Sequence, residues 1–124
     1  MMRVLAIALG GAAGALSRYW VSNAVHALAG RGFPYGTLTV NVLGSLVMGF
    51  LTVLFLERMD VGPEWRAAIL IGFLGAFTTF STFSIETLNL IESAQYLKAG
   101  VNMTVSLAAC VVAAWLGVLG GRTL

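Results

Sequence analysis

The chemically richest part of the sequence is the segment from residue 72 to residue 86. Five Ser and Thr side chains fall within seven positions there, shortly after Gly72 and Gly75. Glycine is costly in a helix and hydroxyl side chains compete for backbone hydrogen bonds, so this segment is a poor continuous helix. We therefore expect a break in the helix between Gly75 and Thr79. Backbone carbonyls released by such a break could bind a small cation such as sodium.

Phenylalanines are interleaved with these hydroxyl residues. Phe77, Phe80 and Phe83 recur every three residues, which predicts that their rings share one face of the helix. Rings at this spacing usually serve packing, but Ser81 and Thr82 beside them favour an ion path, because hydroxyls are wasted in an apolar core. The electropositive edge of a phenyl ring can contact an anion without holding it as tightly as Arg or Lys would.

The second and fourth apolar segments carry two further polar stripes. Thr37, Asn41 and Ser45 recur every four residues. The amide of Asn41 could bond a neighbouring helix, or its NH2 group could donate to a passing anion. Asn102 and Ser106 also share one face of a helix, which is typical of ordinary contacts between helices.

Two charged residues, Arg18 and Glu86, fall inside apolar segments. A guanidinium stays protonated, so Arg18 must reach the headgroups, a carboxylate or a water-filled vestibule. The first alternative predicts an interfacial residue, and the last predicts a funnel that attracts anions. Glu86 is a candidate functional carboxylate, or it pairs with Arg18 or caps a helix. A supporting role is slightly favoured, because a negative charge in an anion path would repel the ion.

The elements that must position these residues are membrane-spanning helices. Of the 124 residues, 59% are hydrophobic and 10% are charged, and the mean hydropathy of +0.93 is too high for a soluble domain. Apolar helices long enough to cross a bilayer are expected at residues 4–29, 35–56, 67–91 and 99–121. The sequence predicts a single all-α transmembrane domain over residues 1–124. The first helix is expected to be retained rather than cleaved as a signal peptide, because its apolar run continues past Arg18.

Charge and cysteine content exclude several classes of protein. One cysteine and one histidine exclude a disulfide scaffold and a Cys/His metal cluster. No run of basic residues suggests nucleic acid as a partner. With four spans, the positive residues at the two ends of the helices number four against three: Arg3, Arg58, Arg66 and Arg122 against Arg31, Lys98 and Arg18. So small a bias would permit insertion in both directions and hence an antiparallel dimer.

The residues indicate transport rather than catalysis. No nucleophile with a base and an orienting group is visible, nor a phosphate loop or cofactor motif, so we do not expect an enzyme. A proton-coupled exporter of cationic drugs would use Glu86 and an aromatic pocket. An anion channel would use neutral donors and ring edges, which Asn41 and the Phe80–Phe83 segment supply better. An inert assembly subunit would leave the hydroxyl-rich segment unexplained.

Three motifs resemble one known family along essentially the whole chain. They are GGAAGALSRY at residues 10–19, GTLTVNVLGS at residues 36–45 and GAFTTFSTFSIE at residues 75–86. In this order and spacing they resemble the Fluc (CrcB-type) fluoride channel family, and the third motif is highly specific. The resemblance implies an antiparallel, dual-topology homodimer in the inner cell membrane. Two fluoride pores at its interface would passively export toxic fluoride from the cytoplasm.

The resemblance also implies roles for individual residues. The residues implied to line the fluoride pore are Asn41, Phe80, Ser81, Thr82 and Phe83. Backbone carbonyls of Gly75 and Thr78 from each subunit would bind a structural sodium ion at the dimer centre, and Arg18 would lie toward the aqueous vestibule. The motifs fix the fourth helix less well than the others. The candidate supporting residues are Glu86, Thr104 and Ser106.

Overall fold

The structure is a computed structural model that describes residues 1–124, and it is helical throughout, with no strands. Its helices long and apolar enough to cross a membrane are Met2–Ala29, Tyr35–Arg58, Pro63–Glu92 and Tyr96–Thr123. The prediction of an all-helical protein with four such helices is confirmed. The third span begins at Pro63, four residues before its expected start, because the missing N–H of proline suits a first helical turn.

Two of the four spans are divided into shorter elements. The first span is α1 (Met2–Ala29) and the last is α6 (Tyr96–Thr123). The second span consists of α2 (Tyr35–Val53) and the π-helical turn η1 (Leu54–Arg58). The elements of the third span are α3 (Pro63–Arg66), the π-helical η2 (Ala67–Phe73), α4 (Leu74–Phe77) and α5 (Phe80–Glu92). Nothing in the residue pattern had predicted the π-helical turns.

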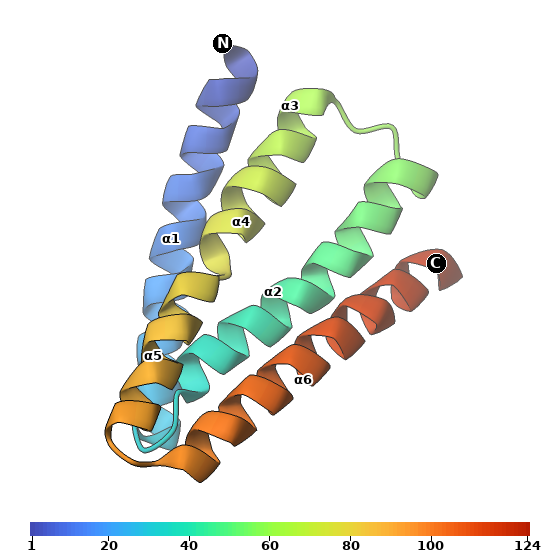
Figure 1. Ribbon diagram of the computed structural model, residues 1–124. Helices are drawn as coiled ribbons and strands as arrows, with labels where there is room; N and C mark the ends of the chain where they lie inside the picture. Colours follow the sequence, from blue (N-terminus) through green and yellow to red (C-terminus); the bar gives the residue numbers. More distant parts are fainter.

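The helices are arranged as two pairs (Figure 1). α2 runs beside α6, and α1 runs beside η2 and α4. Glycines allow both pairs to approach closely: a Cβ atom on Gly117 would collide with the Leu46 carbonyl, and one on Gly14 with the Phe73 carbonyl. The pairs diverge toward the end of the molecule that holds the N-terminus, so a single chain has the shape of a V.

The junction between α4 and α5 consists of Thr78 and Thr79, whose backbone is extended. Their φ and ψ angles are −89° and 158° for Thr78 and −153° and 122° for Thr79. Because these residues interrupt the helical phase, the prediction that Phe77 shares a face with Phe80 and Phe83 is wrong. The Phe77 ring is buried and stacks on Phe73, with 5.9 Å between ring centroids. Phe80, in contrast, is 78% exposed.

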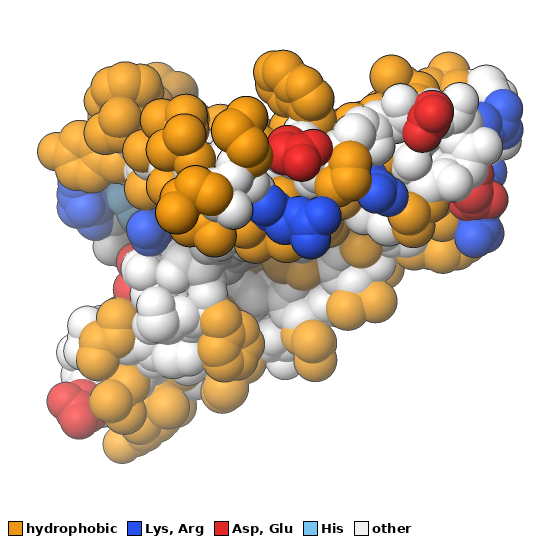
Figure 2. Space-filling view, turned by 90° about the horizontal axis from the view of Figure 1, so that it is seen from above, with side chains coloured by type: hydrophobic (Ala, Val, Ile, Leu, Met, Phe, Trp, Pro, Cys, Tyr) orange, Lys and Arg blue, Asp and Glu red, His pale blue; other side chains and the backbone are white.

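Most large apolar side chains point outward. Only eight hydrophobic residues are buried, among them Val40, Leu74 and Ala99, whereas Leu28, Leu107 and Trp115 are exposed. Figure 2 shows hydrophobic side chains standing out over much of one end of the molecule, with charged side chains scattered between them. An outward apolar surface on a thin core is what a bilayer solvates well. The structure is that of a multi-pass membrane protein.

Candidate functional site

A groove of about 600 Å³ runs along one side of the α2–α6 pair. The α4–α5 junction and the start of α5 form its other wall. Its lining residues are Asn41, Gly44, Ser45, Met48, Thr78, Thr79, Phe80, Phe83, Met103, Ser106, Leu107, Cys110 and Ala114. No charged side chain is among them, so the groove offers only apolar surface, ring edges, hydroxyls, the Cys110 thiol and one amide.

Asn41 holds the extended backbone of the junction through two hydrogen bonds. Its Nδ2 donates to the Thr79 carbonyl at 3.0 Å, and its Oδ1 accepts from the Thr79 N–H at 2.8 Å. In an unbroken helix, the Thr79 N–H would bond the Gly75 carbonyl and the Thr79 carbonyl would accept from the Phe83 N–H. The side chain of Asn41 thus replaces both helical bonds, and the second N–H of its amide group remains for the groove.

The sequence around the junction explains why the chain can open there. Gly44 lies one turn beyond Asn41, and a Cβ atom on it would collide with the Thr78 methyl group. The Thr78 hydroxyl donates back to the Leu74 carbonyl at 3.0 Å, which ends the preceding helix. The Thr79 hydroxyl accepts from the Thr82 N–H at 3.2 Å and so caps the start of α5.

Phe80 and Phe83 lie on the first turn of α5 and both line the groove. Their ring centroids are 5.4 Å apart and their planes are tilted by 44°. This tilted arrangement leaves ring edges accessible rather than stacking the two faces. Ser81 and Thr82 lie on the same turn, but their hydroxyls point toward the cap, at 3.4 Å and 3.1 Å from the Thr79 hydroxyl. Neither of them lines the groove of a single chain.

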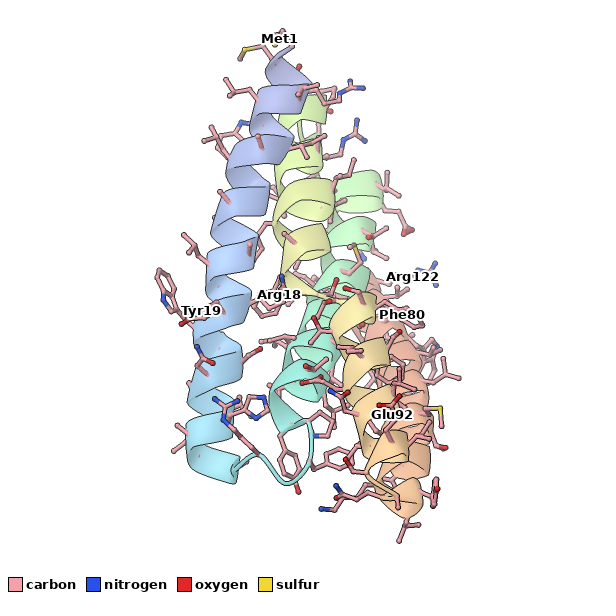
Figure 3. All side chains as sticks on the ribbon, turned by 60° about the vertical axis from the view of Figure 1, so that its left-hand side comes forward. Met1, Arg18, Tyr19, Phe80, Glu92 and Arg122 are labelled. Atoms are coloured by element: carbon pink, nitrogen blue, oxygen red, sulfur yellow. The ribbon has the colours of Figure 1, made fainter.

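Arg18 reaches from α1 to the junction (Figure 3). Its Nε donates to the Ala76 carbonyl at 3.0 Å, while the neighbouring Tyr19 points away from the bundle. The carbonyl end of a helix is its negative end, so the guanidinium lies where a cation is stabilised. The structure thus gives Arg18 a partner, a backbone carbonyl, that was not among the alternatives drawn from the sequence. Sequence reasoning missed this contact because no motif links residues 58 positions apart.

Two backbone carbonyl oxygens at the α4–α5 junction lack the hydrogen bonds that a continuous helix would give them. The Thr78 carbonyl accepts no hydrogen bond, and the Gly75 carbonyl receives none from the N–H groups of Thr78 or Thr79. Gly75 is exposed on the surface of the single chain. No group of three or more His, Cys, Asp or Glu side chains is placed to bind a metal ion. Backbone oxygens are suitable ligands for a hard cation such as sodium.

Glu86 lies on α5, one turn beyond Phe83. Its Oε1 is buried and has no hydrogen-bond partner within the chain. The alternative in which Glu86 pairs with Arg18 is wrong, because Arg18 instead bonds the Ala76 carbonyl. The ion pair in the structure is at the far end, where Arg122 Nε lies 3.8 Å from Glu57 Oε2 on the surface.

Residues on α6 connect to α5 through buried hydrogen bonds. Asn102 Nδ2 donates to Thr87 Oγ1 at 2.9 Å, and Ser106 Oγ donates to Asn102 Oδ1 at 3.2 Å. All three residues are buried, and Asn102 is only 2% exposed. Thr104 lies on the exposed side of α6, away from the groove. Sequence reasoning missed Thr87 because a single Thr in an apolar helix gives no periodic signal.

Residues 5–118 match the family model described as CrcB-like protein, Camphor Resistance (CrcB). The chain belongs to the CrcB family. The resemblance drawn from the three motifs is thereby confirmed.

Relatives of this CrcB-family chain carry the name Fluoride-specific ion channel FluC. The one from Methylococcus capsulatus is 54% identical over 123 residues, which are 99% of this chain but 54% of the relative, so the chain spans about half of that protein. The one from Coxiella burnetii is also 54% identical and is covered completely, with 99% of this chain aligned. The one from Geobacter metallireducens is 46% identical over the full length of both chains. The relatives are channels rather than enzymes, in agreement with the expectation that this chain is not an enzyme.

In this CrcB-family chain, the groove gathers some of the predicted site residues and leaves others outside. Those that line it are Asn41, Thr78, Phe80, Phe83 and Ser106. Those outside it are Arg18, Gly75, Ser81, Thr82, Glu86 and Thr104. The stripe of Asn102, Ser106 and a third residue, Cys110, divides in the same way, since Ser106 and Cys110 face the groove and Asn102 lies behind them.

Proposed function

We propose that this chain forms a fluoride-selective channel that exports fluoride from the cytoplasm passively, down its electrochemical gradient. The observation that carries the proposal is the uncharged lining of the groove, to which the Asn41 amide and the rings of Phe80 and Phe83 all contribute. Membership of a family whose relatives are named fluoride-specific channels identifies the ion.

The chemistry of the groove suits an anion that must enter and then leave. Removing a small anion from water into an apolar medium costs on the order of tens of kcal/mol, so donors must replace its water. The second N–H of the Asn41 amide and the ring edges can do this in steps. A fixed Arg or Lys would bind the ion too tightly for conduction, and none lines the groove.

The pore is proposed to be completed by a second, antiparallel copy of the chain. In one chain the groove is open along a side, and Phe80 is 78% exposed at its rim. A two-fold axis in the membrane plane would cover both grooves at once and give two separate pores. In such a dimer Ser81 and Thr82, which face away from their own groove, would be available to the partner subunit as the polar track.

The α4–α5 junction brings two opposite helix ends together at the groove. The positive N-terminal end of α5 favours an anion, and the negative end of α4 favours a cation. We propose that the carbonyls of Gly75 and Thr78 hold a structural sodium ion at the centre of the dimer. The partnerless Thr78 carbonyl supports this proposal. When bound, the ion would supply a fixed positive charge that keeps the two junctions together.

Charged residues beside the junction are proposed to act on the ion from outside the groove. Arg18 bonds the Ala76 carbonyl and is half-buried, so its charge would attract fluoride toward the groove from an aqueous vestibule. Glu86 is proposed as a supporting residue in the completed dimer. Its buried, partnerless oxygen would otherwise fit a second candidate function, the proton-coupled export of cationic drugs.

The test is an efflux assay on purified protein in liposomes. A potassium gradient and a potassium ionophore set the voltage, and electrodes follow fluoride and chloride separately. We expect fluoride efflux at least a hundred-fold above that of protein-free liposomes, with chloride efflux at background. Equal passage of both ions, or of neither, would rule out a selective fluoride channel. Proton movement coupled to a cationic dye and abolished by Glu86→Gln would instead establish the drug exporter.

A further inference from the structure

The buried contact between α5 and α6 is a continuous chain of hydrogen bonds. Ser106 Oγ donates to Asn102 Oδ1 at 3.2 Å, Asn102 Nδ2 donates to Thr87 Oγ1 at 2.9 Å, and Thr87 Oγ1 donates to the Phe83 carbonyl at 2.8 Å. The chain begins at a residue of the groove, Ser106, and ends at the backbone of another, Phe83. It is therefore connected to the proposed pore at both ends.

The direction of every proton in this chain is fixed by its last member. A carbonyl oxygen can only accept, so the Thr87 hydroxyl must use its single proton on Phe83. The Thr87 oxygen must then accept, which turns the NH2 group of Asn102 toward it. That orientation leaves Asn102 Oδ1 facing Ser106, so Ser106 must donate its own proton inward. Reversing any one bond would leave a buried polar atom without a partner, which is costly in an apolar interior.

Two consequences follow for the groove. Ser106 donates its proton to Asn102, which lies behind the groove lining. The Ser106 oxygen therefore presents only lone pairs to an ion in the groove. The bond from Asn102 to Thr87 also holds α5 at one rotation against α6. That rotation turns the rings of Phe80 and Phe83 into the groove, since these residues lie seven and four positions before Thr87 and so share its face of α5.

We propose that Asn102 is a positioning residue of the channel, which sets the rotation of α5 and turns the Ser106 proton away from the ion. The inference rests on the proposed function and adds where fluoride finds its donors. The ion is contacted by Asn41 and the ring edges on the α2 and α5 side, and meets only oxygen lone pairs at Ser106. Chloride and fluoride are then distinguished by the rings, whose orientation toward the groove Asn102 maintains.

The first arm of the test measures fluoride efflux from liposomes for five variants. Asn102→Asp keeps the shape of the side chain but removes its donor, and Thr87→Val keeps the shape of Thr87 but removes its hydroxyl. We expect each to reduce fluoride efflux at least ten-fold and to lower the ratio of fluoride to chloride flux. Thr87→Ser keeps the hydroxyl that Thr87→Val removes, so its efflux should be within three-fold of that of the unsubstituted chain. Asn89→Asp is the matched control for added charge, because Asn89 is exposed on α5, and it should stay within two-fold.

The fifth variant, Ser106→Ala, tests the direction of the chain. Ser106→Ala leaves Asn102 Oδ1 without its donor but keeps the Asn102–Thr87 bond between the helices, so it should reduce efflux less than Thr87→Val does. A larger loss than in Thr87→Val would mean that Ser106 donates to fluoride, and the direction proposed here would be wrong. Unchanged efflux and selectivity in Thr87→Val would overturn the positioning role, even if Asn102→Asp failed to fold.

A second arm separates this inference from the proposed function. Amide hydrogen exchange in α5 reports on its attachment to α6 whether or not the protein conducts. Exchange at residues 83–90 should be at least five-fold faster in Asn102→Asp and Thr87→Val than in Thr87→Ser or Asn89→Asp. If the unsubstituted protein passed no fluoride but showed this pattern, the proposed function would fail and the positioning of α5 would stand. Equal exchange in all variants would overturn the positioning itself.

Discussion

At the scale of single residues, the side chain of Asn41 combines two tasks that sequence reasoning treated as alternatives. It bonds a neighbouring helix element, through the N–H and the carbonyl of Thr79. It also lines the groove, where its remaining N–H can face an anion. One short amide can do both because an Asn side chain carries the same donor and acceptor pair as the peptide group that it holds.

Asn41→Asp should therefore reduce fluoride efflux by about a hundred-fold or more. A carboxylate has no donor for the Thr79 carbonyl, and its charge would repel the ion in a groove that otherwise has none. Fluoride-electrode traces from liposomes check this, with Asn89→Asp on the exposed face of α5 as the control. Efflux equal in the two variants would remove Asn41 from the pore.

The rings at the rim of the groove give a second prediction at this scale. Phe80→Ile and Phe83→Ile keep an apolar side chain but lose the electropositive ring edge, so each should reduce efflux at least ten-fold while the proposed dimer survives. Size-exclusion chromatography reports the dimer and the fluoride electrode reports the flux. Phe33→Ile, in the loop before α2 and outside the groove, should change neither. Normal fluoride flux in both Phe80→Ile and Phe83→Ile would mean that these rings serve packing and do not contact the ion.

At the scale of elements, the turns between spans show where the backbone is under strain. Gly30, which ends α1, has φ 86° and ψ 179°, a conformation open to glycine and few other residues. Ala94, between α5 and α6, has φ 61° although it carries a Cβ atom. Left-handed backbone costs an L-residue roughly 1–2 kcal/mol. Adding a Cβ atom at Gly30 should therefore destabilise the protein, whereas removing the one at Ala94 should not.

Gly30→Ala should destabilise the folded protein by about 1–3 kcal/mol, entirely through the backbone, because a Cβ atom there would meet nothing within 4 Å. Ala94→Gly should instead be neutral or stabilise by up to about 1 kcal/mol, since relief of strain outweighs the added freedom of the unfolded chain. Thermal unfolding of the detergent-solubilised protein checks both. Fluoride efflux should be unchanged, because neither residue lies at the groove. A lower midpoint for Ala94→Gly than for Gly30→Ala would contradict the assignment of strain.

At the scale of the whole molecule, orientation in the membrane decides whether an antiparallel dimer can form. Arg18 was counted with the loop residues at one end, but it bonds the Ala76 carbonyl at the middle of the third span. The positive residues at the two ends are then four against two: Arg3, Arg58, Arg66 and Arg122 against Arg31 and Lys98. The difference between the two ends is then two positive residues, against a difference of one when Arg18 is counted with the loops.

A cysteine at the α5–α6 turn measures the orientation directly. Gln95→Cys in a Cys110→Ala background should react with a membrane-impermeant maleimide from outside the cell in about half of the copies, as dual topology requires. Adding positive charge at the opposite end with Met59→Lys and Asp60→Lys should move that fraction away from one half and reduce fluoride efflux, because antiparallel partners become scarce. A fraction near zero or one in the parent protein would exclude dual topology.

The membrane-spanning helices could be predicted from the sequence because bilayer thickness and the need to satisfy every backbone group leave few other solutions for so apolar a chain. The importance of the segment from Gly72 to Glu86 was likewise visible, since glycines and hydroxyls are poor residues for a helix in lipid. Residue type also decided that Asn41, Phe80 and Phe83 deserved testing as contacts for an anion.

Only the tertiary structure decided which of these polar groups meet. Phe77 left the face of Phe80 and Phe83 because two extended residues reset the helical phase. Arg18 donates a hydrogen bond to a carbonyl rather than pairing with a carboxylate, and Asn102 on α6 donates one to Thr87 on α5. Such pairings depend on how helices rotate and cross. That geometry is set by close glycine contacts between segments far apart in the chain, which the spacing of residues along one helix does not encode.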